Sequence, residues 1–253
     1  MNFWIIIPSR YASTRLPGKP LAEIDGKPMV VHVYKKACSS GAARVIVATD
    51  DQRIEDCLKG VGAEVIQTAS DHASGTDRVA EAARLAGAEK EQIIVNLQGD
   101  EPGMLPALLD QVALSLHQHS AADVATLTEE ISDPEILWNP NSIKVVRDKN
   151  NFALYFSRAP IPWVRGQLDR NQPAQAIIRK ETALRHIGLY AYRNEYLQQL
   201  TQFPVCNLEQ DEALEQLRVL YHGGKIIAET ACKTPPAGID TPADLLRWQK
   251  AFN

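Results

Sequence analysis

The sequence predicts an α/β protein whose parallel sheet is covered by helices on both faces. Short apolar runs rich in Ile and Val alternate with amphipathic stretches through the first half of the chain. This alternation is typical of parallel sheets, because each strand needs a crossover that returns the chain to the same edge. With 253 residues, the chain suits one large α/β domain and needs no disulfide or metal to stabilise its core.

The first half predicts strands and helices in alternation. Apolar runs predict strands over Phe3–Ile7, Arg44–Ala48, Glu64–Gln67 and Gln92–Leu97. Apolar residues at helical spacing predict helices over Met29–Ser39, Asp51–Gly60 and Thr76–Gly87. Ser74 with Asp77 forms a capping pattern for the last helix, and Gly87 follows as its C-terminal cap. Because parallel sheets bind ligands at the carboxyl ends of their strands, we look for functional residues in the loops after strands.

The second half is less regular. It predicts strands over Asp123–Thr128, Ser142–Arg147, Ala153–Arg158, His186–Arg193 and Lys225–Thr230, the second and third joined by a turn at Asp148–Asn151. It predicts helices over Asn194–Thr201, Leu208–Tyr221 and Thr241–Phe252, the last with Thr241 as N-cap. Residues 160–182 are polar, contain three prolines and predict a mobile loop or insertion. The simplest organisation is one domain over residues 1–253 with an irregular excursion at about 150–200.

Composition excludes several classes of protein. Apolar residues are 45% and charged residues 23%, as in ordinary globular proteins. The 27 basic and 31 acidic side chains give a net charge of −4, which argues against nucleic acid as the main partner. The longest apolar runs have five residues, whereas a membrane helix needs about 20. We therefore expect a cytoplasmic protein that does not bind membranes. The four cysteines form no CxxC pair, so they predict reduced thiols rather than a zinc site or disulfide framework.

A loop of basic and small residues follows the first strand. Residues Pro8–Leu21 bring Arg10, Arg15 and Lys19 together with the hydroxyl of Ser13. Backbone N–H groups and hydroxyls can donate to phosphate oxygens, Arg binds them bidentately, and Lys acts as a point charge. The loop matches neither GxxxxGK[ST] nor GxGxxG. It predicts a triphosphate site, with a solvated basic loop as the alternative.

Two further segments carry candidate ligands. Gln98–Pro102 ends a buried strand with the carboxylate of Asp100, an oxygen ligand of the kind Mg²⁺ prefers, and Asp240 could be a second one. The alternative is that both carboxylates only cap or turn the chain. Ser74–Arg78 opens a helix, where free N–H groups favour acceptors such as a base or ribose, although capping alone also explains Ser74 and Asp77.

Together these segments resemble the 3-deoxy-manno-octulosonate cytidylyltransferases, the CMP-Kdo synthetases of Gram-negative bacteria. The resemblance runs from residue 3 to the terminal helix and spares mainly 103–140 and 163–182. After the phosphate loop, its motifs are Asp71–Arg78, Val95–Pro102, Ala153–Pro162, Leu184–Arg193, Leu214–Arg218 and Gly238–Pro242. Two positions depart from the family pattern: Ser9 stands where Ala is usual, and Gly103 replaces a bulkier apolar residue, which is expected to loosen that turn.

The resemblance implies a doubly wound, mixed and mainly parallel sheet of the nucleotide-diphospho-sugar transferase type. It also implies conversion of CTP and 3-deoxy-D-manno-octulosonate (Kdo) to CMP-Kdo and pyrophosphate, for lipopolysaccharide synthesis, by a cytoplasmic homodimer that uses Mg²⁺. The catalytic residues implied are Arg10, Lys19 and Asp100. The CTP-binding residues implied are Arg10, Ser13, Arg15, Lys19, Ser74, Gly75, Arg78 and Gln98. The Kdo-binding residues implied are Gln98, Arg158, His186, Tyr190, Glu215 and Gln216. The metal ligands implied are Asp100 and Asp240.

Two alternatives remain at this point. One is a cytidylyltransferase for a related acidic sugar, such as 8-amino-Kdo or a sialic acid. The other is a catalytically silent nucleotide-binding or regulatory protein on the same fold. The presence of Lys19 and Asp100 argues against the second alternative.

Overall fold

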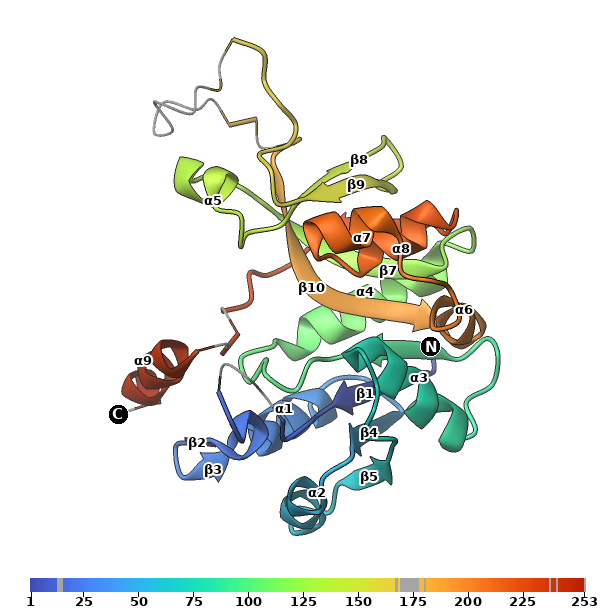
Figure 1. The fold of residues 1–253 in the computed structure, drawn as a ribbon, viewed down its shortest axis with the longest axis vertical. Helices are drawn as coiled ribbons and strands as arrows, with labels where there is room; N and C mark the ends of the chain where they lie inside the picture. Colours follow the sequence, from blue (N-terminus) through green and yellow to red (C-terminus); the bar gives the residue numbers. More distant parts are fainter. Residues whose placement is uncertain are drawn as a thin grey trace.

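A central mixed sheet organises the protein. The computed structural model describes residues 1–12, 16–166, 168, 178–179, 181–236, 238–239 and 241–252. The strands of the sheet are β1 (Phe3–Pro8), β4 (Arg44–Thr49), β5 (Glu64–Gln67), β6 (Ile93–Asn96), β7 (Val124–Glu130), β8 (Lys144–Arg147), β9 (Ala153–Ser157), β10 (Leu184–Arg193) and β11 (Ile226–Thr230). They follow the order β11-β7-β10-β6-β1-β4-β5, with the β8–β9 hairpin attached to β10 (Figure 1).

The pairing confirms a mainly parallel sheet. β6, β1, β4 and β5 are mutually parallel neighbours, as are β7 and β11. β10 is antiparallel to both β6 and β7, and therefore joins the two parallel parts. The carboxyl ends of β1 and β6 lie side by side, because Ile5 pairs with Val95 in this register. This is the edge at which doubly wound folds bind ligands.

Helices cover both faces of the sheet (Figure 1). α1 (Met29–Cys38), α2 (Gln52–Lys59) and α4 (Pro106–Gln118) pack on one face. α3 (Gly75–Leu85), α6 (Asn194–Leu200) and α8 (Gln216–Tyr221) pack on the other. Alternate residues of β1 supply the two layers: Ile5 and Ile7 belong to the first apolar cluster, and Ile6 to the second. All three are fully buried.

Most expected elements are confirmed to within about two residues, and Thr241 accepts a hydrogen bond from the Asp244 N–H at 3.2 Å, as expected of an N-cap. The helix expected over Leu208–Tyr221 is wrong as a single element. It divides into α7 (Asn207–Glu212) and α8, because Ala213 adopts a left-handed conformation with φ 49°. Glu212 is held from outside the helix, since its carboxylate accepts from Ser157 Oγ and from the Arg158 N–H.

Several elements were not expected from the sequence. α4 is the largest, although its buried residues Leu108, Leu109, Val112 and Leu116 recur at helical spacing. The others are a short 3₁₀ helix η1 (Lys19–Leu21), the hairpin β2 (Glu23–Ile24) with β3 (Lys27–Pro28), and α5 (Pro134–Trp138). The terminal helix is α9 (Pro242–Phe252). Much of the loop expected at 160–182 lies outside the described residues.

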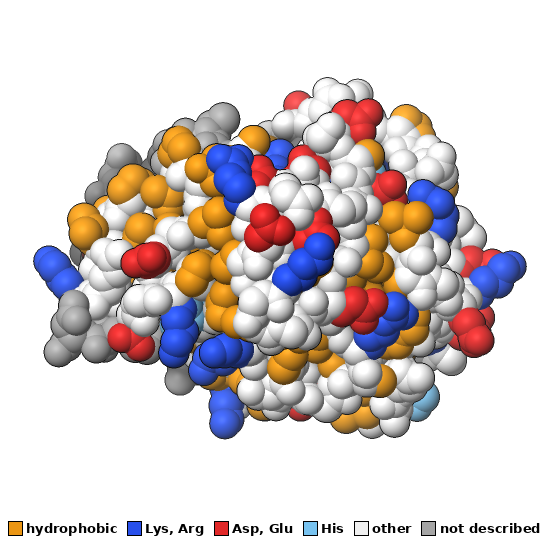
Figure 2. Space-filling view, turned by 90° about the horizontal axis from the view of Figure 1, so that it is seen from below, with side chains coloured by type: hydrophobic (Ala, Val, Ile, Leu, Met, Phe, Trp, Pro, Cys, Tyr) orange, Lys and Arg blue, Asp and Glu red, His pale blue; other side chains and the backbone are white. Residues whose placement is uncertain are grey.

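Three features of the described chain bear on its composition: the surface charge, the character of the helices and the state of the cysteines. On the face drawn in Figure 2, acidic and basic side chains are interspersed, unlike the continuous basic surfaces that follow a phosphate backbone. Within the part of the chain that the structure describes, no helix combines the length and the apolar character needed to cross a membrane. All four cysteines are free thiols.

Candidate functional site

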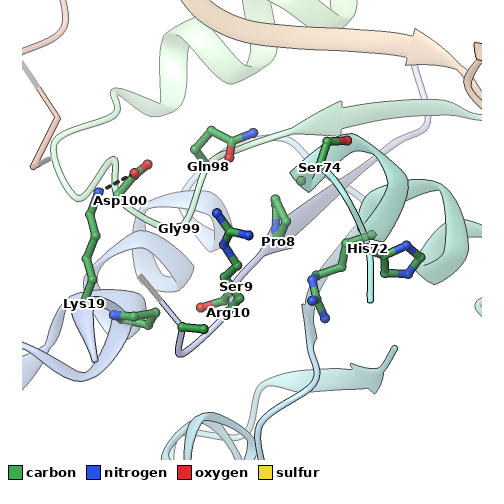
Figure 3. Close-up of a pocket in the computed structure, with 13 residues that line it drawn as sticks. Pro8, Ser9, Arg10, Lys19, His72, Ser74, Gln98, Gly99 and Asp100 are labelled. Carbon is green, nitrogen blue, oxygen red and sulfur yellow. Dashed lines mark hydrogen bonds and ion pairs between the residues drawn. The ribbon is translucent and has the colours of Figure 1, made fainter. Parts of the chain in front are cut away.

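A pocket lies at the carboxyl ends of β1 and β6 and has about 790 Å³ of open space, including the solvent at its mouth (Figure 3). Three segments line it: the loop after β1 with η1, the start of α3, and the turn after β6. The sequence-predicted residues among its lining are Arg10, Lys19, Ser74, Gly75, Arg78, Gln98 and Asp100. Ser13, Arg15 and Asp240 lie outside the described residues.

An ion pair connects two of the lining segments. Lys19 Nζ lies 2.6 Å from Asp100 Oδ2, and the dashed line in Figure 3 marks this contact. The Lys19 side chain is 10% exposed and that of Asp100 37%, so the carboxylate is the more open partner. η1 buries the Lys19 stem, and its N-cap Gly18 has φ 68°, a left-handed conformation that suits glycine. The pair holds a cation and a carboxylate at fixed places at one end of the pocket.

Gly99 allows the ends of β1 and β6 to approach closely. A Cβ at residue 99 would lie 2.9 Å from the carbonyl oxygen of Pro8, which no side chain tolerates without a backbone shift. The close approach places Arg10, an exposed residue of the loop after β1, opposite Gln98 and Asp100. The glycine therefore allows cationic and anionic groups to share one small pocket.

The start of α3 forms the third wall. Ser74 and Asp77 make a complete capping box, with Asp77 N–H donating to Ser74 Oγ at 3.1 Å and Ser74 N–H donating to Asp77 Oδ2 at 3.0 Å. The capping interpretation of Ser74 is therefore confirmed, and any contact with a nucleotide would be additional. Arg78 is 3% exposed, and its guanidinium lies 3.3 Å from Asp50 Oδ2.

His72 also lines the pocket, although the sequence patterns assign it no role. Its Nε2 lies 2.6 Å from Glu81 Oε2, and this carboxylate also accepts from the Ala69 N–H at 2.8 Å. Glu81 therefore fixes the imidazole ring beside the start of α3. His72 stands two residues before the Ser74–Arg78 motif, and this position is the sequence signal from which its place at the pocket could have been predicted.

Arg158 lies at the end of β9, outside the pocket lining. Its Nε donates to the carbonyl of Glu212 at 2.6 Å, Nη1 to that of Pro140 at 3.0 Å and Nη2 to that of Ala213 at 3.3 Å. A guanidinium has five N–H donors, so one N–H on each terminal nitrogen has no partner among the described residues. The side chain braces the α7–α8 junction and retains a pair of donors.

The other sugar-side candidates form a neighbouring group around β10. The rings of His186 and Tyr190 are 5.3 Å apart, and Tyr190 pairs with Asn96 of β6 in the sheet register. Burial lowers the pKa of His186 to about 3, so the ring is neutral at physiological pH. Its Nε2 lies 2.9 Å from Thr126 Oγ1.

Glu215 and Gln216 lie at the start of α8. The Thr76 hydroxyl donates to Glu215, which connects this group to the α3 wall of the pocket. Gln216 is 8% exposed, and its Nε2 is buried with no hydrogen-bond partner among the described residues. An unsatisfied buried donor is costly, which is consistent with a ligand acceptor there.

The carboxylate of Asp100 is suitable for Mg²⁺, since it is a partly exposed oxygen donor that lines the pocket. The chain just before Asp240 reaches the same place, because the Ile239 N–H donates to the Asp100 carbonyl at 3.0 Å. The described residues contain no cluster of three or more metal-ligating side chains. They fit an ion that takes one or two protein carboxylates and completes its shell with phosphate and water.

Comparison with known proteins gives consistent results. A cytidylyltransferase family model matches residues 4–226. The chain is 51% identical over 249 residues to a 3-deoxy-manno-octulosonate cytidylyltransferase from Pasteurella multocida (strain Pm70), covering 96% of each protein. It is 50% identical to the enzyme of the same name from Saccharophagus degradans, covering 98% of this chain and 97% of that one.

Solved structures agree. A CMP:2-keto-3-deoxy-manno-octonic acid synthetase complexed with CTP superposes with a TM-score of 0.87 at 40% identity, over 99% of this chain and 98% of that chain. A cytidylyltransferase from Leptospira borgpetersenii, with TM-score 0.59 and 16% identity over 98% of this chain and 84% of that one, shares the fold.

Proposed function

The chain belongs to the 3-deoxy-manno-octulosonate cytidylyltransferase family, and from this membership we propose that it converts CTP and Kdo to CMP-Kdo and pyrophosphate. The observation that carries the proposal is the pocket at the ends of β1 and β6, where Lys19 and Asp100 meet. The anomeric hydroxyl oxygen of Kdo attacks the α-phosphorus of CTP, the bond to the bridging oxygen breaks, and pyrophosphate leaves. The hydroxyl proton passes to solvent.

The basic residues stabilise the leaving group in this proposal. Arg10 and Lys19 line the pocket, where they hold the phosphates and offset the charge that develops on pyrophosphate. Arg15 of the same loop contributes a third cation. Catalysis then comes from positioning and electrostatic stabilisation rather than from a covalent intermediate.

We propose that Asp100 and Asp240 hold Mg²⁺. Bound there, the ion neutralises phosphate charge and lowers the pKa of a coordinated hydroxyl. Asp100 Oδ2 is paired with Lys19, so the carboxylate is held at the pocket before any ligand arrives. The Ile239–Asp100 backbone hydrogen bond supports a role for the adjacent Asp240.

Kdo binds on the side of β10 and α8 in this proposal. The two spare N–H groups of Arg158 suit a carboxylate, and the buried Nε2 of Gln216 suits a hydroxyl. Glu215 accepts from Thr76 at the α3 wall of the pocket, and the ring of Tyr190 lies 5.3 Å from that of neutral His186, which completes the group. Ordinary Kdo is favoured over 8-amino-Kdo or a sialic acid, because relatives at about 50% identity carry its name.

We further propose a cytoplasmic homodimer that supplies activated Kdo for lipopolysaccharide synthesis. The dimer is carried over from the family resemblance, and the exposed side chains of Leu154 (61%) and Trp163 (57%) are the positions we would test first for a subunit contact. Light scattering in solution measures the mass, and a monomer at micromolar concentration contradicts the dimer.

The decisive experiment measures pyrophosphate release from CTP with and without Kdo. We expect release that depends on Kdo, with CMP-Kdo identified by mass spectrometry. 8-Amino-Kdo and a sialic acid serve as comparison substrates, and higher kcat/KM for either one would change the assigned sugar. No release with any of the three would contradict the proposed reaction.

A further inference from the structure

A chain of side-chain hydrogen bonds runs from the pocket into the sugar side of the site. Gln98 Nε2 donates to Asn96 Oδ1 at 2.9 Å, Asn96 Nδ2 donates to Thr76 Oγ1 at 3.5 Å, and Thr76 Oγ1 donates to Glu215 Oε1. Asn96 is 1% exposed and Thr76 6%, so water has little access to the middle of the chain. Its two ends are residues to which the family resemblance assigns substrate contacts, whereas the two middle residues carry no assignment.

The direction of this chain is fixed by its last member. The Thr76 hydroxyl has one proton, and an ionised Glu215 can only accept it. Thr76 Oγ1 must then accept from its other neighbour in the chain, the amide nitrogen of Asn96. The side-chain oxygen of Asn96 therefore faces Gln98, and the side-chain N–H of Gln98 donates to it.

As a result, the side-chain carbonyl oxygen of Gln98 is available as a hydrogen-bond acceptor in the pocket. The Gln98 carbonyl oxygen lies over the start of α3, where a Cβ on Gly75 would be 3.3 Å from it. Figure 3 shows this oxygen on the side of Pro8 and Arg10, with the amide nitrogen on the side of Ser74. The glycine at residue 75 keeps that space open. Gln98 can therefore accept a hydrogen bond at the boundary between the nucleotide side and the sugar side.

We propose that Asn96 and Thr76 are positioning residues that orient the Gln98 amide, so that the pocket offers an acceptor to a hydroxyl group of the substrates. Glu215 sets the orientation through them. The inference rests on the proposed function, because the hydroxyl group belongs to the CTP–Kdo pair. It goes beyond that function by giving a role to two buried residues that do not line the pocket.

The protonation of Glu215 decides whether the chain holds its direction. Burial raises the pKa of Glu215, while the hydrogen bonds from Thr76 and Ser74 and the charge of Arg218 lower it; Asp77 acts in the opposite sense. The phenols of Tyr190 and Tyr192 face it from β10, and burial keeps both protonated. When the pH falls below the pKa of Glu215, its carboxyl group is protonated and no longer has to accept a hydrogen bond from the Thr76 hydroxyl. Substrate binding should therefore weaken on the acid side.

Thr76→Val tests the chain by removing one hydroxyl at nearly constant volume. We expect the KM for Kdo to rise about tenfold, as for one hydrogen bond in a buried network. The acid limb of kcat/KM should also move to higher pH, because Glu215 loses a hydrogen bond that lowers its pKa. Thr76→Ser keeps the hydroxyl and should restore both values. Ser115→Ala removes a buried hydroxyl from α4, on the opposite face of the sheet, and should change neither.

A second measurement needs no turnover. Carboxyl ¹³C NMR of the full-length protein gives the pKa of Glu215, and exchange of the Gln98 side-chain amide protons reports its hydrogen bond. We expect Thr76→Val to raise that pKa and accelerate that exchange, with Thr76→Ser near wild type. Unchanged NMR values, or a lower unfolding midpoint with an unmoved acid limb, would overturn the inference. Failure of the wild type to use Kdo would instead overturn the proposed reaction. The NMR result would still decide whether the hydrogen bonds through Thr76 and Asn96 orient the Gln98 amide.

Discussion

The ion pair of Lys19 with Asp100 determines the charge pattern at the level of single residues. The Lys19 side chain is 10% exposed and its Nζ lies 2.6 Å from the carboxylate, which in the proposed function preorganises the cation for the leaving phosphates. Lys19→Ala should lower kcat about 10²-fold, the scale for one preorganised charge-stabilising donor. Pyrophosphate release measures kcat, and Lys27→Ala, on an exposed lysine of β3, is the matched control. A Lys19→Ala variant with wild-type kcat would remove Lys19 from the mechanism.

Asp100→Asn tests the proposed metal site. It keeps the shape of the side chain but removes the charge that attracts a divalent cation and pairs with Lys19. We expect the Mg²⁺ concentration for half-maximal activity to rise at least tenfold, measured on protein stripped with a chelator. Wild-type activity that persists without divalent cations would show that neither Asp100 nor Asp240 acts through a metal.

In the proposed function, Arg158 both binds the Kdo carboxylate and braces the α7–α8 junction, and one substitution tests both tasks. Arg158→Lys keeps a positive charge but loses the planar fork, and with it the two spare donors. The KM for Kdo should rise by the equivalent of about 1.5–3 kcal/mol, with the KM for CTP nearly unchanged. The unfolding midpoint should also fall, because three backbone carbonyls around α7 lose a donor. Equal increases in both KM values would make Arg158 a scaffold residue only.

At the level of elements, the α7–α8 break is the informative feature. Ala213 has φ 49°, a conformation that costs a residue with a Cβ about 1 kcal/mol or more. Ala213→Gly should therefore raise the free energy of unfolding by about 0.5–1 kcal/mol, measured by urea denaturation. Gly223→Ala is the opposite test, since Gly223 has φ 82° and should lose stability. A loss of stability in Ala213→Gly would show that the left-handed residue is not strained.

The same break shows how far sequence reasoning reaches. Strands such as Phe3–Pro8 and helices such as Gly75–Leu85 carry their own periodicity and caps, so local patterns predict them. The division at Ala213 has no local signal, because it depends on Glu212 reaching Ser157, which is 55 residues away. α4 shows a different failure: its pattern is clear, but it is not among the elements derived from the sequence.

The residues of the candidate site also fall into two groups, those that sequence patterns predict and those that depend on contacts between distant elements. Arg10, Lys19, Gln98 and Asp100 follow strand ends, so the rule for parallel sheets is enough to predict that they share one pocket. Asn96 and Thr76 are different, because their importance comes from hydrogen bonds across elements. Strand and helix periodicity marks them only as buried positions. Sequence patterns therefore predict the residues at the pocket surface better than those behind it.

For the molecule as a whole, a small apolar cluster connects the C-terminal helix to the pocket. Ile24, Met29 and Ile239 are fully buried in it, and Leu245 and Trp248 of α9 pack against them. Trp248 and Pro236 also fill the space beside Gly103, where a Cβ would lie 2.5 Å and 2.4 Å from their side chains. The departure of Gly103 from the family pattern therefore provides a packing site for the terminal helix rather than a loose turn.

A double-mutant cycle tests whether this packing reaches the catalytic residues. Gly103→Ala forces Trp248 and Pro236 aside, and should cost about 1–3 kcal/mol of unfolding free energy. In a Trp248→Ala background the cost should fall by about 1 kcal/mol, because one of the two clashes is gone. kcat should fall in both single variants, since Ile239 is hydrogen-bonded to Asp100 and moves with the displaced segment. Leu246→Ala, on a 57% exposed residue of the same helix, controls for damage to α9 itself. Additive costs in the cycle, or single variants with wild-type kcat, would show that the terminal helix packs beside the turn after β6 without positioning Asp100.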